Sequence, residues 1–502
     1  MGSVRSVRVG RWVLALLVAC PLAAAAGPAS LVEAVKAGDP AAVRALLRTA
    51  DVNVREADGT TALHWASNRE DVPMVDLLLR AGADARAVNR FGVTPLSVAA
   101  QKGNAAILTR LLDAGADPNV TMTGGETPLM TAARVGLREP MRVLVARGAA
   151  VDAREATRGQ TALMWAAAAG NTEAVKVLIE AGANVNLRAT GPPQREGAAR
   201  ARGGRLDSLN ALLFASRRGH LESVRLLLDA GANIRDTAAD GSGPVALAIA
   251  NAHFGTASLL LDRGADPNAS TEGWTALHQL TRIRRPSIAR MAPPVGFDSP
   301  AGIELAKKLV AKGANVNARM TRNVNDTYRH VDDRKGATPF YLAAKGLDTK
   351  MMGVLLGLGA DPRLPTEEGS TPLMAAVGFG DTAPGEAGTE EDGIEATKAL
   401  LAVLETKDVN AVNDNGWSAL HAVAFRGSVP IARLLIAKGA QLDAEIYRGY
   451  TALGIATGWR ELNQRYEQLE VAALLREEMS KRGLKVDGFA NSGLPFDGSE
   501  QQ

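Results

Sequence analysis

The residues best suited to catalysis or metal binding are few and scattered in this chain of 502 residues. It holds one cysteine, Cys20, which allows neither an internal disulfide nor a paired-cysteine zinc site. No phosphate-binding glycine loop, nucleophile elbow, HExxH motif or dinucleotide fingerprint occurs. The six histidines never pair at metal-ligand spacing; they are His64, His220, His253, His278, His330 and His421. We therefore predict no metal, no cofactor and no enzymatic activity, which leaves binding by arginine, lysine and tryptophan side chains.

The charge balance argues against nucleic acid as a partner. The chain has 57 Lys and Arg against 54 Asp and Glu, a formal net charge of +3. Arg5, Arg8 and Arg11 lie in the first 26 residues, which contain no acidic residue, so the remainder holds 54 residues of each sign. Aromatic residues make up only 4% of the chain, which is few for stacking on bases. The sequence thus predicts a charge-balanced protein that binds no nucleic acid.

Residues 1–26 have the pattern of an export signal. The three arginines precede an apolar run over residues 12–19, and small residues follow up to Ala24-Ala25-Ala26. That run is short for a membrane span, and no later segment has the roughly 18 consecutive apolar residues one needs, so no span is predicted. Leu17-Val18-Ala19-Cys20 also resembles a lipobox, in which Cys20 becomes a lipid anchor. We expect an exported protein, periplasmic or extracellular, or a lipid-anchored envelope protein if Cys20 is modified; abundant Ala and Arg suggest a bacterial source.

The rest of the chain repeats at a period near 33 residues. Thr61-Ala62-Leu63 returns as Thr94-Pro95-Leu96, Thr127-Pro128-Leu129 and Thr161-Ala162-Leu163. A Gly-Ala pair follows each of these leucines, with an apolar doublet such as Leu78-Leu79 in between. Thr at an N-cap and Pro at the first helical position begin a helix, and Gly in the left-handed conformation ends one. Each unit is therefore predicted to be two short helices and a tight turn, which must stack on neighbours to bury an apolar face.

These landmarks resemble the ankyrin repeat over residues 29–483, in about twelve units. The resemblance implies an all-α repeat solenoid of helix–turn–helix units with short β-turn or hairpin fingers. It also implies a protein partner bound through turn tips and first helices, without catalysis, and we expect a monomer. His64, His278 and His421 occupy a Thr-x-Leu-His slot, or its Ser variant, where the resemblance implies structural hydrogen bonds between units. The last unit is expected to carry its second helix between residues 460 and 482.

Four insertions interrupt the array. They lie near residues 189–205, 284–302, 320–335 and 381–392, and the last of them is predicted to be an acidic loop. Residues 484–502 lack the landmarks and are predicted to be a flexible C-terminal tail. Insertions in repeat arrays often mark a binding surface, although surface loops also tolerate extra residues at little energetic cost. Polar side chains of residues 284–335 that converge in one pocket would favour an enzyme or a small-molecule binder instead.

Basic residues gather at one position of the repeat. The fifth and sixth residues after the leucine landmark end the first helix, and in twelve units none of them is acidic. Nine are basic: Lys36, Arg69, Lys102, Arg134, Arg217, Arg218, Arg282, Lys345 and Arg426. Because the two signs are nearly equal in number overall, this distribution predicts a cationic face that attracts an acidic partner. Family habit is the competing explanation, because ankyrin repeats often carry Arg or Lys at this position.

Two tryptophans, Trp274 and Trp417, stand just before the N-cap of their units. In the family this position tends to face partners, so an exposed Trp would suit an interface anchor, unless it packs against the adjacent turn. The sequence as a whole predicts an exported protein–protein interaction scaffold. The alternatives are an enzyme or small-molecule binder at residues 284–335, and a secreted host-directed effector.

Overall fold

The computed structural model describes residues 30–191, 208–271, 273–284, 298–323, 333–378, 388–446, 449–461 and 464–486. The expected export signal with Cys20, His330, most of the four insertions and the tail beyond residue 486 lie outside the described residues. The chain forms two compact units, which are described separately. The N-terminal unit comprises residues up to Thr123 with Ala146–Gly148, and the C-terminal unit comprises Gly124–Val145 with Ala149–Gln502.

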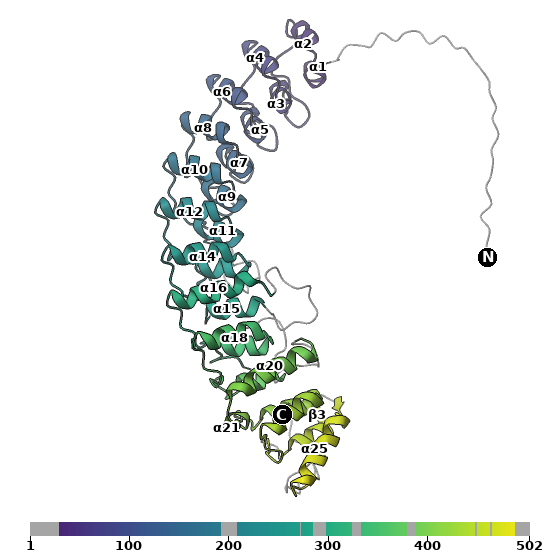
Figure 1. Cartoon of the computed structure of the whole chain (residues 1–502). Helices are drawn as coiled ribbons and strands as arrows, with labels where there is room; N and C mark the ends of the chain where they lie inside the picture. Colours follow the sequence, from purple (N-terminus) through teal and green to yellow (C-terminus); the bar gives the residue numbers. More distant parts are fainter. Residues whose placement is uncertain are drawn as a thin grey trace, which may run out of the picture. The chain divides into compact units, whose positions relative to one another are not determined.

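The N-terminal unit consists of helix pairs stacked in two layers (Figure 1). Its helices are α1 (Leu31–Ala37), α2 (Pro40–Leu46), α3 (Ala62–Asn68), α4 (Val72–Arg80), α5 (Pro95–Lys102) and α6 (Ala105–Asp113). The first helices of the pairs, α1, α3 and α5, pack side by side, and the second helices α4 and α6 pack behind them. Each pair buries its apolar face against the next pair, as a repeat that cannot form a core alone requires.

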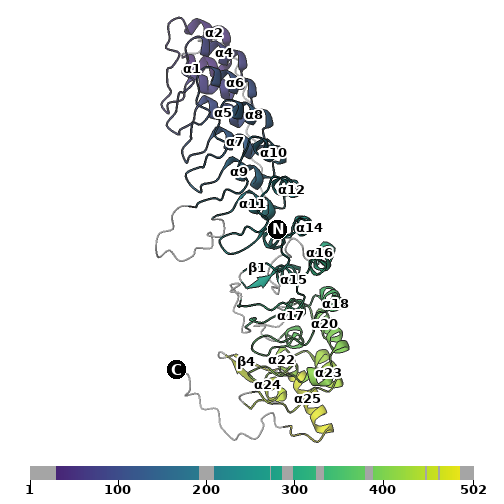
Figure 2. The same cartoon turned by 90° about the vertical axis from the view of Figure 1, so that its left-hand side faces the viewer.

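The same pattern runs through the C-terminal unit. Its helices are α7 (Pro128–Val135), α8 (Arg138–Ala146), α9 (Ala162–Ala169), α10 (Thr172–Glu180), α11 (Ala211–Arg218), α12 (Leu221–Asp229), α13 (Pro244–Ala250), α14 (Phe254–Asp262), α15 (Ala276–Arg284), α16 (Pro300–Ala311), α17 (Pro339–Lys345), α18 (Thr349–Gly357), α19 (Pro372–Ala376), α20 (Glu390–Val403), α21 (Thr406–Val409), α22 (Ala419–Arg426), α23 (Val429–Ala437), α24 (Ala452–Ala456) and α25 (Leu469–Lys481). Apart from the one-turn α21, the helices described in the two units form twelve pairs, the number that the sequence predicts. In each unit the connections between pairs project on one side as fingers (Figure 2).

The predicted helix starts and ends are confirmed. The Thr94 side chain accepts a hydrogen bond from the Ser97 amide, and Thr338 does the same for Tyr341. All nine glycines of the Gly-Ala pairs have φ between 85° and 99°: Gly82, Gly115, Gly148, Gly182, Gly231, Gly264, Gly313, Gly359 and Gly439. Only a residue without Cβ adopts this left-handed conformation freely, which explains the excess of glycine in the chain.

Three histidines form hydrogen bonds between neighbouring repeats, as the resemblance implies. In His421, Nδ1 accepts from the Ser418 amide at 3.1 Å, so Nε2 carries the proton and donates to the Ala444 carbonyl at 2.9 Å. His64 and His278 make equivalent bonds, to the carbonyls of Val93 and Ala337. Burial lowers the pKa of both His278 and His421 to about 4, so both are neutral at pH 7. The expected structural role of these side chains is confirmed.

Two predicted local structures are wrong. Residues 390–392 are not part of an acidic loop but form the first turn of α20, because Thr389 caps that helix and the Asp392 carboxylate accepts the Thr389 amide in return. Acidic side chains also suit the positive end of a helix. In the last unit a two-stranded hairpin, β3 (Trp459–Glu461) and β4 (Gln464–Tyr466), precedes the second helix, which therefore begins only at Leu469. A shorter hairpin, β1 (Ser270–Thr271) with β2 (Trp274–Thr275), forms the finger before α15.

Candidate protein-binding surface

In the N-terminal unit, one cation of the predicted cationic face is compensated by a neighbouring carboxylate. The Lys36 ammonium stands 4.7 Å from the centre of the Trp65 ring and 2.6 Å from the Glu56 carboxylate. Trp65 Nε1 donates to the other oxygen of Glu56, at 2.6 Å. The bond to Lys36 lowers the pKa of Glu56, so this carboxylate stays ionised. Arg69 is exposed, and its Nη1 donates to the Lys36 carbonyl at 2.8 Å.

A related stack in the C-terminal unit leaves more of its cation exposed. The Arg134 guanidinium lies 5.2 Å from the centre of the Trp165 ring and pairs with Glu126 at 3.3 Å. Half of the Arg134 side chain is exposed, at 53%. A cation over an aromatic face is attracted by the ring and loses little freedom when a second anion arrives. Arg134 is therefore held in place while several of its donors still face solvent.

The least compensated cations lie on α11 and α5. Arg217 is half-buried and Arg218 is exposed, in the last turn of α11, and Lys102 is exposed at the end of α5. None of the three side chains forms an ion pair or a side-chain hydrogen bond with any residue in the described part of the chain. The last turn of a helix favours positive charge, so the position itself does not require a partner. These residues are the part of the predicted cationic face that is available to bind an anion.

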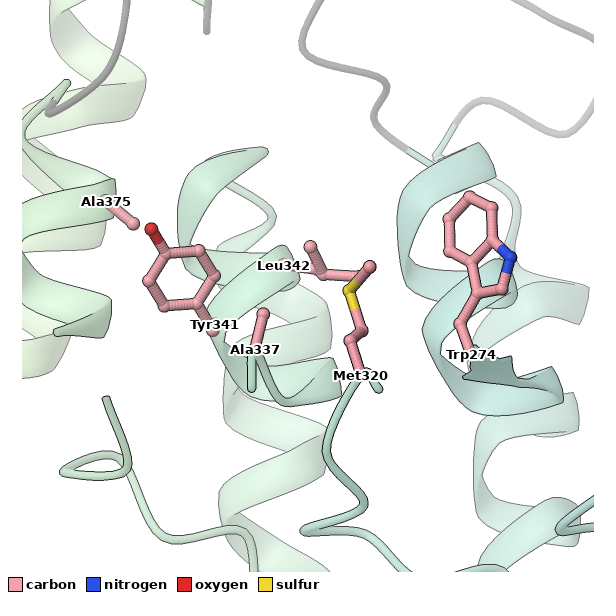
Figure 3. Packing of buried hydrophobic residues seen from close by; sticks show 6 residues of the cluster. All are labelled: Trp274, Met320, Ala337, Tyr341, Leu342 and Ala375. Atoms are coloured by element: carbon pink, nitrogen blue, oxygen red, sulfur yellow. The ribbon is translucent and has the colours of Figure 1, made fainter. Parts of the chain in front are cut away.

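Two of the predicted surface residues are buried, and for them the expectation is wrong. Lys345 is only 3% exposed, because all seven residues of α17 are buried and the helix offers it no surface. Trp274 is 6% exposed and belongs to an apolar cluster with Met320, Ala337, Tyr341, Leu342 and Ala375. Figure 3 shows Met320 lying between the Trp274 ring and Tyr341. Trp274 thus packs against the adjacent turn and anchors the core of this region.

The remaining candidate binding residues are intermediate in solvent exposure. Arg282 stacks on Trp274 at 5.0 Å from the ring centre and is half-buried. Trp417 is also half-buried and meets His421 edge-on, with 6.2 Å between ring centres. Arg426 is half-buried at the end of α22. Each keeps some exposure, so its role in binding stays a prediction.

A buried ionic cluster surrounds Arg284, the last residue of α15, and was not predicted from the sequence. Arg284 is fully buried; its Nε lies 2.9 Å from Asp348, and its Nη2 lies 3.2 Å from Asp298. It also donates through Nη1 to the Ser299 carbonyl. Asp348 in turn caps α18 by accepting the Met351 amide, and Lys350 pairs with Asp298 at 2.9 Å. The sequence signal was an arginine at the boundary between a helix and an insertion.

The described ends of the two middle insertions are anchored at opposite ends of the first helices. Arg284 and Asp298 bound the first insertion at the C-terminal end of α15. Asn323 and Arg334 bound the second, in the finger that precedes α17, where Asn323 accepts the Arg334 amide. Among the described residues no group of side chains could hold a metal ion. In the same part of the chain no helix is long and apolar enough to cross a membrane.

Paired helices in two layers, with fingers on one side and buried Thr-x-Leu-His bonds between units, define a helical-repeat binding protein. The chain belongs to the ankyrin repeat family: the model described as "Ankyrin repeats (3 copies)" matches residues 31–122, 119–189, 212–291 and 387–482, well over half of its length. The predicted family and fold class are confirmed.

Several known proteins are similar to parts of this chain. Alpha-latrocrustotoxin-Lt1a of Latrodectus tredecimguttatus is 28% identical over 51% of this chain and 16% of the toxin. Ankyrin repeat and SOCS box protein 3 of Bos taurus is 30% identical over 43% of this chain and 34% of that protein. Human NF-kappa-B inhibitor alpha is 33% identical over 22% of this chain and 32% of the inhibitor. The chain therefore spans about a third or less of the length of these relatives.

Among solved structures, the crystal structure of the human ASB11 ankyrin repeat domain is 27% identical. The match covers 47% of this chain and 98% of that domain, with a TM-score of 0.40.

Proposed function

We propose that this chain is an exported, non-catalytic scaffold that binds one acidic protein partner as a monomer. Ankyrin repeats bind protein partners over extended surfaces, and the name of one relative, NF-kappa-B inhibitor alpha, states that it inhibits another protein. The observation that carries the proposal is the pair Arg217 and Arg218 on α11, which has no compensating carboxylate in the described residues. Arg134, fixed on Trp165 two first helices earlier, extends the positive charge.

An acidic partner suits this surface because charge steers its approach. The helices α7 and α11 are separated by α9, so they are two packing steps apart. At the usual 8–10 Å between packed helices, this places them about 20 Å apart. Arg134 and Arg218 would therefore contact an extended segment of about six residues, at 3.3 Å per residue. The α9 residues at the same position are Ala168 and Ala169, whose small side chains let such a segment pass closely. Export is supported by the arginines and apolar run of residues 1–26.

A photo-crosslinking amino acid at position 218 tests the proposal directly. The matched control places it at Arg225, on the second helix α12 of the same pair, where the native side chain pairs with Glu222. In the cell envelope fraction, position 218 should yield one dominant crosslinked protein that position 225 does not. Charge reversal of Arg134 and Arg217 in the crosslinking chain should weaken that product, most strongly at low salt. Equal crosslinking from both positions, or indifference to charge reversal, would contradict the proposal.

A further inference from the structure

One finger of the N-terminal unit carries an exposed aromatic residue at its turn. Among the fingers that the structure describes, ten turn at a glycine with φ between 61° and 93°, and the residue before that glycine is polar, charged or glycine in nine of them. These nine residues are Asp58, Gly124, Arg158, Asp240, Glu272, Lys335, Glu368, Asn415 and Arg448. The tenth is Phe91, whose side chain is 53% exposed. These nine fingers form with a polar residue or glycine at this position, so the turn itself does not require the phenylalanine.

Phe91 is held rigidly although its ring faces solvent. Its amide and that of Val93 both donate to Asn89 Oδ1, each at 3.0 Å, and its carbonyl accepts from Thr123 Oγ1 at 2.8 Å. The preceding amide, of Arg90, donates to the Asp58 carbonyl of the neighbouring finger at 2.9 Å. A side chain on such a fixed backbone loses little entropy when a partner covers it.

The surroundings of Phe91 are apolar and positively charged. Val88 in the same finger is 43% exposed. The Arg90 guanidinium stands 4.7 Å from the centre of the Phe91 ring, and Arg55 is fixed beside Val88 by a bond from Nη1 to the Val88 carbonyl, at 3.1 Å. Asp58 is the nearby carboxylate, and it already accepts the Thr60 amide at 2.9 Å. The surface therefore carries two guanidinium groups, and the nearby Asp58 carboxylate is already hydrogen-bonded.

We propose that Phe91, Val88, Arg90 and Arg55 form a docking site for a partner segment with a large apolar side chain beside an aspartate or glutamate. The apolar side chain would cover the Phe91 ring and Val88, and the neighbouring carboxylate would receive the guanidinium donors of Arg90 or Arg55. The inference rests on the proposed function, since it requires a protein partner, but it names a different surface and a second recognition element.

The test is selection from a phage-displayed library of random dodecamer peptides on the immobilised full chain. The wild type should enrich peptides in which a large apolar residue lies within two positions of Asp or Glu. Phe91→Asp should abolish that enrichment. The far-ultraviolet circular dichroism spectrum should stay unchanged, because the exposed Phe91 ring is not part of the apolar core. The matched control is Leu469→Asp, which alters an apolar side chain that is 67% exposed on α25. This variant should enrich the same peptides as the wild type.

A synthetic enriched peptide then gives the size of the effect by fluorescence anisotropy. Phe91→Ala should weaken its binding about tenfold or more, as expected for an aromatic anchor. Arg90→Gln should weaken it about threefold and reduce its salt dependence. Replacing the peptide carboxylate with its amide should match the loss in Arg90→Gln and add nothing in that variant.

Each other outcome overturns the docking site. No enrichment, enrichment without an acidic residue, or peptides retained by Phe91→Asp would each exclude it. Peptides retained by Phe91→Asp but lost on charge reversal of Arg217 and Arg218 would exclude this site and leave the proposed function intact. A wild-type dimer that Phe91→Asp converts to monomers in sedimentation velocity would assign the patch to a second copy of the chain.

Discussion

The junction between the two helices of an ordinary pair and the junction between α15 and α16 are held in place by different interactions. At the ordinary junction α9 ends at Gly170, with φ 77°, and α10 begins two residues later at Thr172. His220 of the next unit lies over that glycine, with Nε2 3.3 Å from the Ala168 carbonyl. At the other junction α15 ends in the buried Arg284, and fifteen residues pass before α16 begins at Pro300. There a guanidinium between two carboxylates takes the place of the imidazole.

This difference indicates where the array is most sensitive to mutation. A hydrogen bond between neutral groups of neighbouring repeats contributes about 1 kcal/mol. When the bond is lost, water can still hydrogen-bond to the groups that remain. A buried ion pair adds little net stability as a whole, but removal of one partner strands the other charge at a cost of about 3–5 kcal/mol. The junction at α15 and α16 should therefore be robust as an intact cluster and fragile to any single change within it.

The largest expected effect follows from removing the buried cation. Arg284→Met should lower the free energy of unfolding by about 4 kcal/mol, because Asp348 keeps its negative charge in the interior. Urea denaturation measures the loss, and hydrogen exchange should show faster exchange of the α18 amides that Asp348 caps. Arg282→Met, two residues earlier and half-buried, is the control and should cost less than about 1 kcal/mol.

A double variant separates a stranded charge from lost packing. In Arg284→Met with Asp348→Asn, the asparagine can still cap α18 but carries no charge, so most of the loss should be recovered. Unchanged instability in the double variant would show that packing of the arginine, not its charge, holds the junction.

The next effect concerns the two tryptophans that precede their N-caps. Trp274→Ala should cost about 3 kcal/mol, because the ring fills a core with Met320 and Tyr341. Trp417→Ala, at the equivalent position of an ordinary unit, should cost about 1 kcal/mol, because that ring is half-buried. Thermal and urea unfolding compare the two variants. Equal losses would contradict the view that the region around α15 depends on its own apolar cluster.

Acid should affect the neutral histidine bonds and leave the guanidinium charged. The pKa of His278 and of His421 is about 4 in the folded chain and about 6.5 in an unfolded one. Since the unfolded chain binds more protons in between, stability falls as pH drops from about 6.5 towards 4, by roughly 2 kcal/mol per histidine at pH 5. Urea unfolding at pH 7 and pH 5 measures this, and His421→Gln should remove its share of the difference. An unchanged pH dependence in His421→Gln would exclude this histidine as its source.

Features that recur along the array could be predicted from the sequence, whereas interactions that occur once in the chain could not. Thr94, Gly170 and His421 belong to a pattern that repeats in fixed register, and each has a local physical reason that does not depend on distant residues. Arg284 and Asp348 are 64 positions apart, and apart from the position of Arg284 beside an insertion nothing local distinguishes them from surface charges. The burial of Lys345 and Trp274 likewise results from packing around α17, which no spacing rule describes. Among the candidate binding residues, the positions could be predicted but their exposure could not.

The smallest effect tests the ordinary junction itself. Gly170 and Gly182 both have positive φ, 77° and 85°, so alanine at either site should cost about 1 kcal/mol in backbone strain. An added Cβ at Gly182 meets nothing within 4 Å, whereas at Gly170 it would lie 2.5 Å from the His220 ring. Gly170→Ala must therefore also displace His220 and lose its bond to the Ala168 carbonyl, for a total of about 2 kcal/mol.

A His220→Ala background isolates that second part of the cost. In His220→Ala the two glycine substitutions should become equally costly, because only the strain at positive φ remains. Urea denaturation of the six chains measures both differences. If Gly170→Ala stayed more costly than Gly182→Ala without His220, the imidazole would not be what joins these repeats, and the contrast with the charged junction at Arg284 would fail.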